Sequence, residues 1–192
     1  AKNGATLQAL SKKLDELVEL QPDYVVIQFG HNDQKRYDTQ VYKAHLQSYV
    51  DRIQKGGGKP IIVSSVTRRS FDENGRIVSN LVRNEKYSYK ATLTDYAKAA
   101  EALARELNLP FLDLHRVSIA HHNEIGREES MTYNFIEGDK THFNKKGAEA
   151  ITDLIIEELK IAVPELAGYL KTSKPADSIP TEQVETKYDL IR

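Results

Sequence analysis

The chain has 192 residues, a length that suits one domain with a substantial hydrophobic core. Its formal net charge of −1 argues against nucleic acid as a partner, because such binding depends on a basic face. There is no cysteine, which excludes disulfides and thiolate catalysis, and no apolar run approaches the length of a membrane span, so we expect no membrane partner.

Hydrophobic residues recur at helical spacing in four segments, which predicts helices over residues 6–20, 39–55, 93–107 and 145–159. Gly56-Gly57-Gly58 ends the second of these helices, and Asn144 is suited to cap the start of the last. The three glycines do not indicate a phosphate-binding loop, because no strand precedes them and no lysine–serine pair follows. We expect a loop over residues 76–90 and a partly helical excursion over residues 117–137.

Short apolar runs rich in β-branched residues predict buried strands over residues 23–29, 61–66 and 109–114. Because these strands alternate with helices, they imply βαβ units and a parallel sheet covered by helices on both faces. The predicted fold class is therefore α/β, a three-layer αβα sandwich. Polar residues follow all three strands, and the carboxyl ends of parallel strands share one edge, where ligands bind.

The carboxyl-terminal segment differs in composition from the rest of the chain. After Pro164 it is rich in proline, serine, threonine and charged residues, and it has no clear hydrophobic period. We therefore assign residues 1–166 to one domain and residues 167–192 to a tail or extended arm.

Gly30-His31-Asn32-Asp33 directly follows the first predicted strand. A glycine at this place lets the backbone turn sharply, and an asparagine there can direct an amide N–H toward a ligand. Glycine, asparagine and aspartate are also ordinary turn residues, so this segment taken alone supports a ligand site and a simple turn equally.

Asp139 and His142 lie three residues apart, just before the last predicted helix. A carboxylate at this spacing can accept a hydrogen bond from one imidazole nitrogen, which leaves the other nitrogen to act as a base toward a serine hydroxyl. The alternative is a loop histidine capped by a nearby carboxylate, since Asp-x-x-His is a short pattern.

Together, in this order and in an α/β chain, the two motifs resemble those of the SGNH (GDSL-type) hydrolases over residues 1–166. Segments at and between them look like the rhamnogalacturonan acetylesterase branch of that superfamily. These segments are Phe-Gly-His-Asn-Asp-Gln, Lys-Pro-Ile-Ile-Val, Arg-Arg-Ser-Phe-Asp-Glu-Asn-Gly, Leu-Asp-Leu-His-Arg-Val-Ser and Thr-His-Phe-Asn-Lys-Lys-Gly-Ala.

The resemblance implies roles for four residues. Asn32 would donate its side-chain amide to an oxyanion, and Gly4 would donate its backbone N–H. His142 would be the catalytic base and Asp139 its orienting partner. The family's Gly-Asp-Ser block, which supplies the nucleophile, is absent from the sequence. We therefore expect the nucleophile upstream of residue 1, and we expect the 192 residues to be inactive by themselves. Either residues outside this sequence supply the missing strand, or the chain is a fragment.

The missing block has a structural consequence as well. In the family, the first strand is central in the sheet and lies beside the strand expected at residues 23–29, so without it that strand would present an exposed apolar edge.

No serine of the sequence clearly takes the place of the missing nucleophile. Ser64 and Ser65 lie inside a predicted strand and Ser70 in the loop beyond, and none forms a strand-to-helix elbow. Ser130 lies in an irregular segment that permits no assignment.

Other residues near the predicted ligand edge are candidates for substrate binding. Arg68 and Arg69 follow the second strand, where a guanidinium could bind a uronate carboxylate, although a solvated loop explains them equally well. His31 could contact a sugar but is better explained as shaping its loop, and a structural role also suits His115 better. His121-His122 has no further ligand nearby in the sequence, so we predict no metal site.

The sequence thus predicts a carbohydrate esterase that removes acetyl groups from a pectic polysaccharide, rhamnogalacturonan, by Ser-His-Asp chemistry. Its partner would be an acetylated polysaccharide or oligosaccharide, and no metal or organic cofactor is needed. One alternative is a non-catalytic carbohydrate-binding relative without a nucleophile; another is an SGNH esterase acting on a different acetylated sugar or a lipid ester. The resemblance also implies an extracellular or periplasmic location, although no signal peptide is visible.

Overall fold

Three parallel strands form the sheet, in the order β1-β2-β3. They are β1 (Tyr24–Gln28), β2 (Lys59–Val63) and β3 (Phe111–Leu112). Tyr24 is in register with Lys59, and Val63 with Leu112. The structure is a computed structural model that describes residues 4–79 and 91–170.

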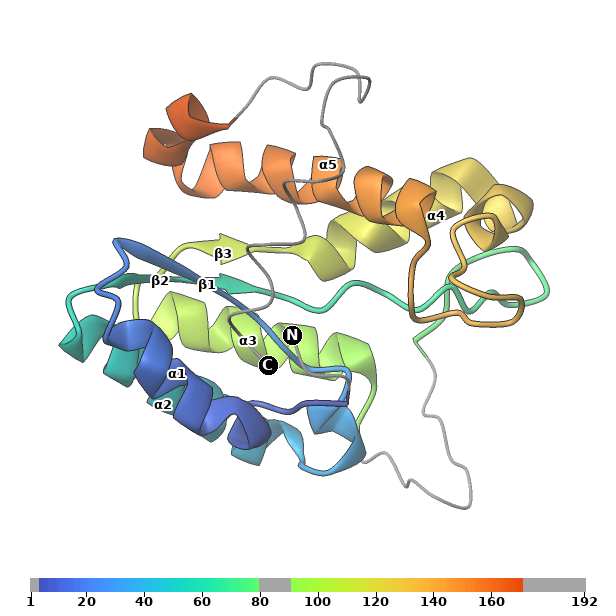
Figure 1. Cartoon of the computed structure of the whole chain (residues 1–192). Helices are drawn as coiled ribbons and strands as arrows, with labels where there is room; N and C mark the ends of the chain where they lie inside the picture. Colours follow the sequence, from blue (N-terminus) through green and yellow to red (C-terminus); the bar gives the residue numbers. More distant parts are fainter. Residues whose placement is uncertain (1–3, 80–90, 171–192) are drawn as a thin grey trace.

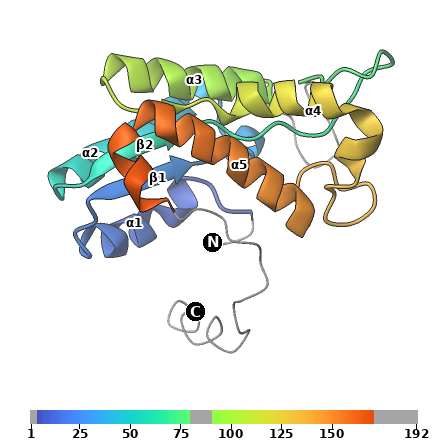
Figure 2. The same ribbon diagram turned by 90° about the horizontal axis from the view of Figure 1, so that it is seen from above.

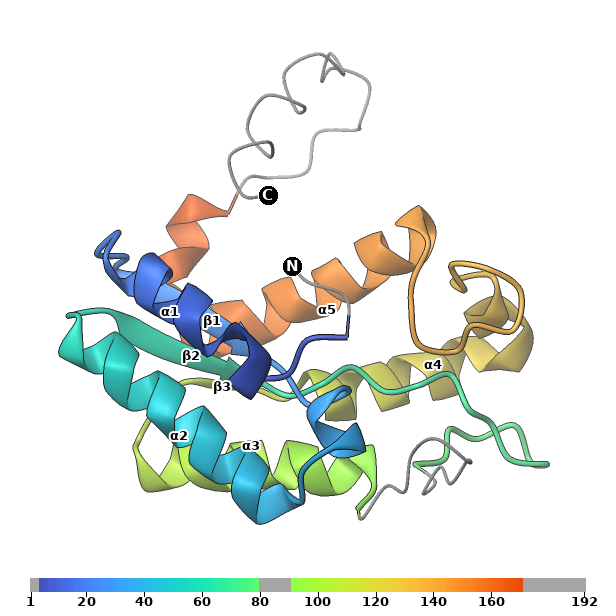
Figure 3. The same cartoon turned by 60° about the horizontal axis from the view of Figure 1, so that its bottom comes forward.

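Within the described residues, five α-helices enclose this sheet in two layers. They are α1 (Ser11–Val18), α2 (Thr39–Lys55), α3 (Leu93–Glu106), α4 (Leu114–Met131) and α5 (Lys145–Ala162), with 3-10 helices η1 (Gln8–Leu10), η2 (Asp33–Lys35) and η3 (Pro164–Tyr169). Helices α1, α2 and α3 lie below the sheet and α4 and α5 above it (Figure 1). Seen from above, α5 crosses the near side (Figure 2), and the opposite side shows α1, α2 and α3 (Figure 3).

Each face of the sheet has its own hydrophobic core, because successive side chains of a strand point to opposite faces. Val25, Ile27 and Ile62 face the core that they share with α1, α2 and α3. Ile61 and Val63 face the second core, which α4 and α5 close. This arrangement confirms the predicted three-layer α/β fold with a parallel sheet.

Predicted element types agree with the structure better than their boundaries do. Asn144 caps α5 as expected, accepting a hydrogen bond from the backbone N–H of Gly147 at 3.0 Å. The third strand was predicted to run to Leu114, but it ends at Leu112 because Asp113 caps α4 by accepting from the Arg116 N–H at 3.2 Å. The partly helical excursion expected over residues 117–137 is helical up to Met131, as part of α4, which is kinked at Gly126 where φ is 78°.

The carboxyl-terminal end of the described chain packs onto the domain. The expected domain end at residue 166 falls inside η3, whose Leu166 packs against the upper core. The Tyr24 hydroxyl on β1 donates to Glu165 Oε1 at 2.9 Å, which ties η3 to the sheet. Most of the predicted arm, and most of the loop predicted over residues 76–90, lie outside the described residues. Among those described, no helix is both long enough and apolar enough to span a membrane.

Strand β1 ends the described sheet, since β2 is its sole neighbour in the strand order. Val26 points away from the lower core and is 56% exposed, although valine in a parallel strand is normally buried on both faces. The expected apolar edge at this strand is therefore confirmed. An edge of this kind is where a further strand would pair.

Gly30 allows the chain to turn where β1 ends. Its φ of 138° is a conformation that residues with a Cβ rarely adopt. A Cβ built at this position would lie 2.4 Å from Ser65 Oγ, and that hydroxyl is held in place by a 2.8 Å hydrogen bond to the Phe29 carbonyl. Backbone conformation and packing both require glycine at this position.

We predict that Gly30→Ala lowers the free energy of unfolding by about 2–4 kcal/mol, because it combines backbone strain with a steric clash. Gly57→Ala is the matched control, since Gly57 also has a positive φ, of 86°, but its Cβ would meet nothing within 4 Å. Gly57→Ala should lower the free energy of unfolding by about 1 kcal/mol. Urea unfolding followed by circular dichroism measures both, and equal losses in the two variants would contradict the steric argument.

Candidate active site

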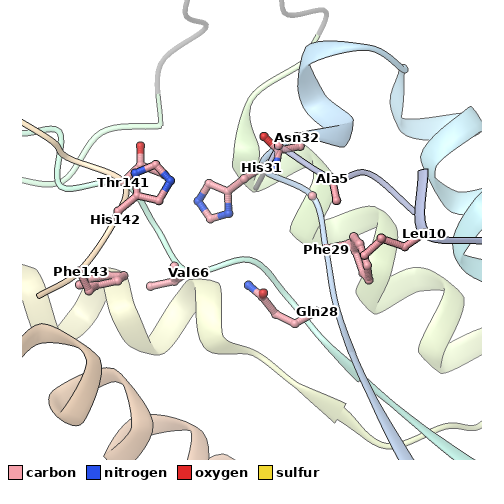
Figure 4. A pocket seen from close by; sticks show the side chains of 12 residues that line it. Ala5, Leu10, Gln28, Phe29, His31, Asn32, Val66, Thr141, His142 and Phe143 are labelled. Atoms are coloured by element: carbon pink, nitrogen blue, oxygen red, sulfur yellow. The ribbon is translucent and has the colours of Figure 1, made fainter. Parts of the chain in front are cut away.

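A cavity of about 530 Å³ opens at the carboxyl end of β1. Segments distant in the sequence line it. The lining residues are Gly4, Ala5, Leu10, Gln28, Phe29, Gly30, His31, Asn32, Val66, Thr141, His142 and Phe143. Figure 4 shows His142 on one side of this pocket and His31 and Asn32 on the other. The structure thus brings together Gly4, His31, Asn32 and His142, as the sequence predicted.

Asp139 and His142 form a hydrogen-bonded pair. His142 Nδ1 lies 2.8 Å from Asp139 Oδ2, while Asp139 Oδ1 accepts from the backbone N–H groups of Thr141 at 2.9 Å and His142 at 3.0 Å. With Nδ1 donating to the carboxylate, Nε2 carries the lone pair that can accept a proton. Asp139 therefore fixes both the orientation and the tautomer of the imidazole.

These hydrogen bonds determine the ionisation of Asp139. Desolvation favours the neutral acid, but hydrogen bonds from the backbone of His142 and Thr141 and from the His142 ring outweigh it and lower the pKa of Asp139 to about 2. Asp139 is therefore ionised at neutral pH and can stabilise a positive charge on His142.

Hydrogen bonds from Arg69 hold the loop that carries this pair. The Arg69 side chain is 0% exposed, and its Nη2 donates to the carbonyl oxygens of Asp139 at 2.9 Å and His142 at 2.6 Å. Its Nε donates to Asn134 Oδ1 at 2.7 Å, and the guanidinium carbon lies 4.2 Å from the centroid of the Phe143 ring. Burial lowers the pKa of Arg69 to about 10, with Asp139 opposing the shift, so the side chain stays charged at neutral pH.

This position corrects the expectation that Arg69 binds substrate. A guanidinium that is buried and donates to three acceptors of its own protein cannot bind a uronate at the surface. For His115 the structure agrees with the structural role that the sequence favoured: it is buried, with Nδ1 3.0 Å from the Ser65 carbonyl and Nε2 2.9 Å from Thr94 Oγ1. Arg68 is half-buried, and its Nη1 donates to Gln34 Oε1 at 3.0 Å.

On the other side of the pocket, the orientation of Asn32 is fixed by Lys35. Lys35 Nζ lies 3.0 Å from Asn32 Oδ1. Because an ammonium group can only donate, the atom beside it must be the amide oxygen, and the amide nitrogen must be at the other end. That nitrogen has no hydrogen-bond partner among the described residues, so Asn32 retains an N–H donor for a ligand in the pocket.

His31 lies next to this amide and is neutral. Desolvation first, and then the positive charge of Arg68, lower the pKa of His31 to about 3. Its Nε2 is buried without a hydrogen-bond partner in the described part of the chain. A neutral imidazole with an unpaired nitrogen at the pocket can exchange a hydrogen bond with a bound molecule.

Asp33 positions the amino-terminal side of the pocket, a role that the sequence gave no means of predicting. Its Oδ1 accepts from the backbone N–H of Leu7 at 3.0 Å, and the Tyr49 hydroxyl donates to the Leu7 carbonyl at 2.6 Å. Desolvation raises the pKa of this fully buried carboxyl. These two bonds hold the segment that contains Gly4 against the end of β1.

No serine lines the pocket in the described part of the chain. Ser64 and Ser65 are buried, and their hydroxyls hydrogen-bond to Asp113 Oδ1 and the Phe29 carbonyl, respectively. Ser130, which the sequence left unassigned, is fully buried with its Oγ 3.0 Å from His122 Nδ1. Within residues 4–79 and 91–170, no three histidine, aspartate or glutamate side chains cluster in a way that could hold a metal ion.

The parallel sheet thus places an Asp–His pair and an amide donor at the pocket by its carboxyl edge. Residues 1–150 match the GDSL-like Lipase/Acylhydrolase family, so the chain belongs to that family and to the SGNH superfamily. It is 35% identical over 179 residues to the rhamnogalacturonan acetylesterase RhgT of Bacillus subtilis (strain 168). It is 30% identical over 148 residues to the probable rhamnogalacturonan acetylesterase YesY of the same organism. These relatives place it in the rhamnogalacturonan acetylesterase-like branch.

The matches cover unequal shares of the proteins compared. The RhgT match spans 83% of this chain and 72% of the relative, and the YesY match spans 72% and 62%. Among solved structures, the acetyl xylan esterase AlAXEase superposes with a TM-score of 0.64 at 19% identity, covering 81% of this chain and 77% of that one. The Bacillus subtilis protein YXIM gives a TM-score of 0.67 at 23% identity over 82% and 43% of the two chains. Both structures share the fold.

We predict that Arg69→Met lowers the free energy of unfolding by about 3 kcal/mol or more, because buried acceptors lose a charged donor. Arg69→Lys retains the positive charge but not the several N–H donors of the planar guanidinium, so it should lower the free energy of unfolding somewhat less. Arg116→Met is the control, because Arg116 is 64% exposed in its ion pair with Glu158 and should cost less than about 1 kcal/mol. Urea unfolding measures all three, and an Arg69→Met variant as stable as the control would refute the fastening role.

We also predict that the carboxyl group of Asp139 stays ionised between about pH 7 and pH 4, so that the chemical shift of its carboxyl carbon does not change over this range. The folded pKa lies below the usual value of 3.8, so the ionised carboxylate stabilises the loop above about pH 4 and loses this effect as the pH falls through 2. Carbon-13 NMR of the carboxyl resonance measures the titration. In His142→Ala the midpoint should rise, since one donor is removed, and an unchanged midpoint would show that the ring does not contribute.

Proposed function

We propose that the protein removes acetyl groups from rhamnogalacturonan by Ser-His-Asp chemistry. The observation that carries the proposal is the Asp139–His142 pair, 2.8 Å apart, at a pocket that also presents the Asn32 amide. Membership of an acylhydrolase family supports ester hydrolysis, and the names of RhgT and YesY support an acetylated pectic substrate.

In this mechanism, a serine outside the described residues attacks the acetyl carbonyl carbon. His142 Nε2 takes the serine proton as the bond to carbon forms, and Asp139 stabilises the resulting imidazolium. Collapse of the tetrahedral intermediate breaks the bond to the sugar oxygen, which receives the proton back from His142. Water then hydrolyses the acetyl-serine by the same steps and releases acetate.

Two donors would stabilise the oxyanion. The Asn32 amide nitrogen is directed to the pocket by its hydrogen bond through Oδ1 to Lys35, and the positive charge on Lys35 further polarises the amide. The backbone N–H of Gly4, which also lines the pocket, is the second donor. One such donor is typically worth about 3–4 kcal/mol of the barrier.

His31 and Arg68 are the proposed contacts to the sugar. Neutral His31 lines the pocket with an unpaired nitrogen that can hydrogen-bond a hydroxyl. Arg68 lies close enough to lower the pKa of His31, and a guanidinium there suits the carboxylate of a uronate. From the resemblance to rhamnogalacturonan acetylesterases, we also propose an extracellular or periplasmic location, where such polysaccharides occur.

A second candidate is an esterase that acts on acetylated xylan, favoured by the structural similarity to AlAXEase. Acetate release from acetylated rhamnogalacturonan, acetylated xylan and an aryl acetate separates the two. Hydrolysis of the aryl acetate with no preference for either polysaccharide would favour a general esterase. Sugar binding without any acetate release would favour a non-catalytic relative.

We predict that His142→Ala lowers turnover in the full-length gene product by about 10³-fold or more, and that Asn32→Ala lowers it by about 10²–10³-fold, with both variants folded. Asn74→Ala, in an exposed turn, should match the wild type. Acetate release measures turnover, and circular dichroism reports folding. Full turnover in either site variant would exclude the proposed mechanism.

A further inference from the structure

The loop that carries Asp139 and His142 exposes two large apolar side chains outside the pocket. Phe135 is 64% exposed and Ile136 is 63% exposed, although Tyr133 just before them is buried. Exposed phenylalanine and isoleucine next to one another cost free energy in water unless something covers them. Their place beside the proposed base makes them candidates for a contact with substrate.

Backbone pairing places Phe135 next to His142. Asn134 and Phe143 form an antiparallel bridge, the Phe135 N–H donates to the His142 carbonyl at 3.2 Å, and the Asn144 N–H donates to the Tyr133 carbonyl at 3.0 Å. Phe135 and His142 are therefore opposite one another, with an expected separation of about 5.5 Å between their Cα atoms.

The same pairing puts both side chains on one face. Asn134 and Phe143 both contact the buried Arg69, so this pair faces inward. Since successive residues of an extended chain alternate, the next pair, Phe135 and His142, faces outward. The exposures agree, because the His142 side chain is 64% exposed, as is Phe135.

The chemistry at His142 determines what would lie on this face. The base that accepts the nucleophile's proton returns it to the leaving oxygen, so that oxygen must come within hydrogen-bond reach of Nε2. In a sugar acetate, the leaving oxygen is attached directly to a pyranose ring. The ring would therefore lie next to the imidazole of His142, the cross-strand neighbour of Phe135.

We infer that Phe135, with Ile136 beside it, is a binding platform for the pyranose ring of the leaving sugar. One face of a pyranose carries C–H groups, which pack on the face of an aromatic ring and remove apolar surface of both partners from water. The platform is held in place because Arg69 binds both Asn134 and the carbonyl of His142. This inference rests on the proposed function, since it takes a sugar as the leaving alcohol.

The first test separates sugar binding from chemistry in the full-length gene product. Phe135→Ala should raise KM for acetylated rhamnogalacturonan oligosaccharide by about five- to tenfold, with kcat within about twofold. It should leave kcat/KM for ethyl acetate unchanged, because ethanol has no ring to contact the platform. Ile161→Ala is the control, because Ile161 is 79% exposed at the far end of α5, about 25 Å from Asn144 along the helix. This variant should leave kcat and KM unchanged for both substrates. An unchanged KM, or equal losses on both esters, would overturn the inference.

The second test needs no catalysis. The chain contains no tryptophan, so Phe135→Trp introduces a single fluorescent indole at the platform. Alkali-deacetylated rhamnogalacturonan oligosaccharide should change its emission saturably, whereas Leu20→Trp, 76% exposed before the opposite end of β1, should not respond. If acetate release is absent but the indole responds, the proposed function fails and the platform stands.

The remaining outcomes count against the platform. If acetate is released but the indole does not respond, the platform is wrong and the proposed function stands. Emission that shifts with protein concentration, together with a dimer in analytical ultracentrifugation, would instead identify the exposed pair as a contact between two copies of the chain. If the pair is a sugar platform and not a dimer contact, Phe135→Ala should leave the sedimentation coefficient unchanged.

Discussion

The buried charge of Arg69 holds the Asp139–His142 side of the pocket in place. Removing a guanidinium from water is costly, and the lowered pKa of Arg69 reflects that cost. The donors of Arg69 offset it by binding two carbonyls of the Asp139–His142 loop and the side chain of Asn134. The loop has almost no regular secondary structure, so these bonds substitute for a ladder of backbone pairs. The orientation of His142, and the outward direction of Phe135, both depend on them.

The opposite side of the pocket follows the same principle with other residues. Buried Asp33 binds the backbone of Leu7 and so brings the segment of Gly4 to the sheet edge, while Lys35 fixes which end of the Asn32 amide is available. The groups proposed to act on the ester, Gly4, Asn32 and His142, are thus each positioned by a polar neighbour. Such support matters because an amide or imidazole stabilises a developing charge best when it needs no reorientation during the reaction.

The two sides meet because of the sheet. Parallel strands place their carboxyl ends along one edge, and the end of β1 carries Gly30, His31 and Asn32 to the edge where the loop after β2 carries Arg69. The edge of β1 is unpaired in the described sheet, and Val26 is exposed beside it. The pocket and the unpaired edge of the described sheet are therefore neighbours.

The sequence by itself determined the fold class, the order of the strands and of the helices other than α4, and the pairing of Asp139 with His142, because each depends on local periodicity or short spacing. It did not determine which polar residues are buried. Arg69 and His115 resembled surface candidates, but they are enclosed by segments that lie 65–73 and 21–50 residues away in the chain, respectively. Strand β3 ended early for a related reason, since Asp113 caps a helix instead of extending the strand. Burial and capping depend on which distant groups meet, and tertiary packing alone decides that.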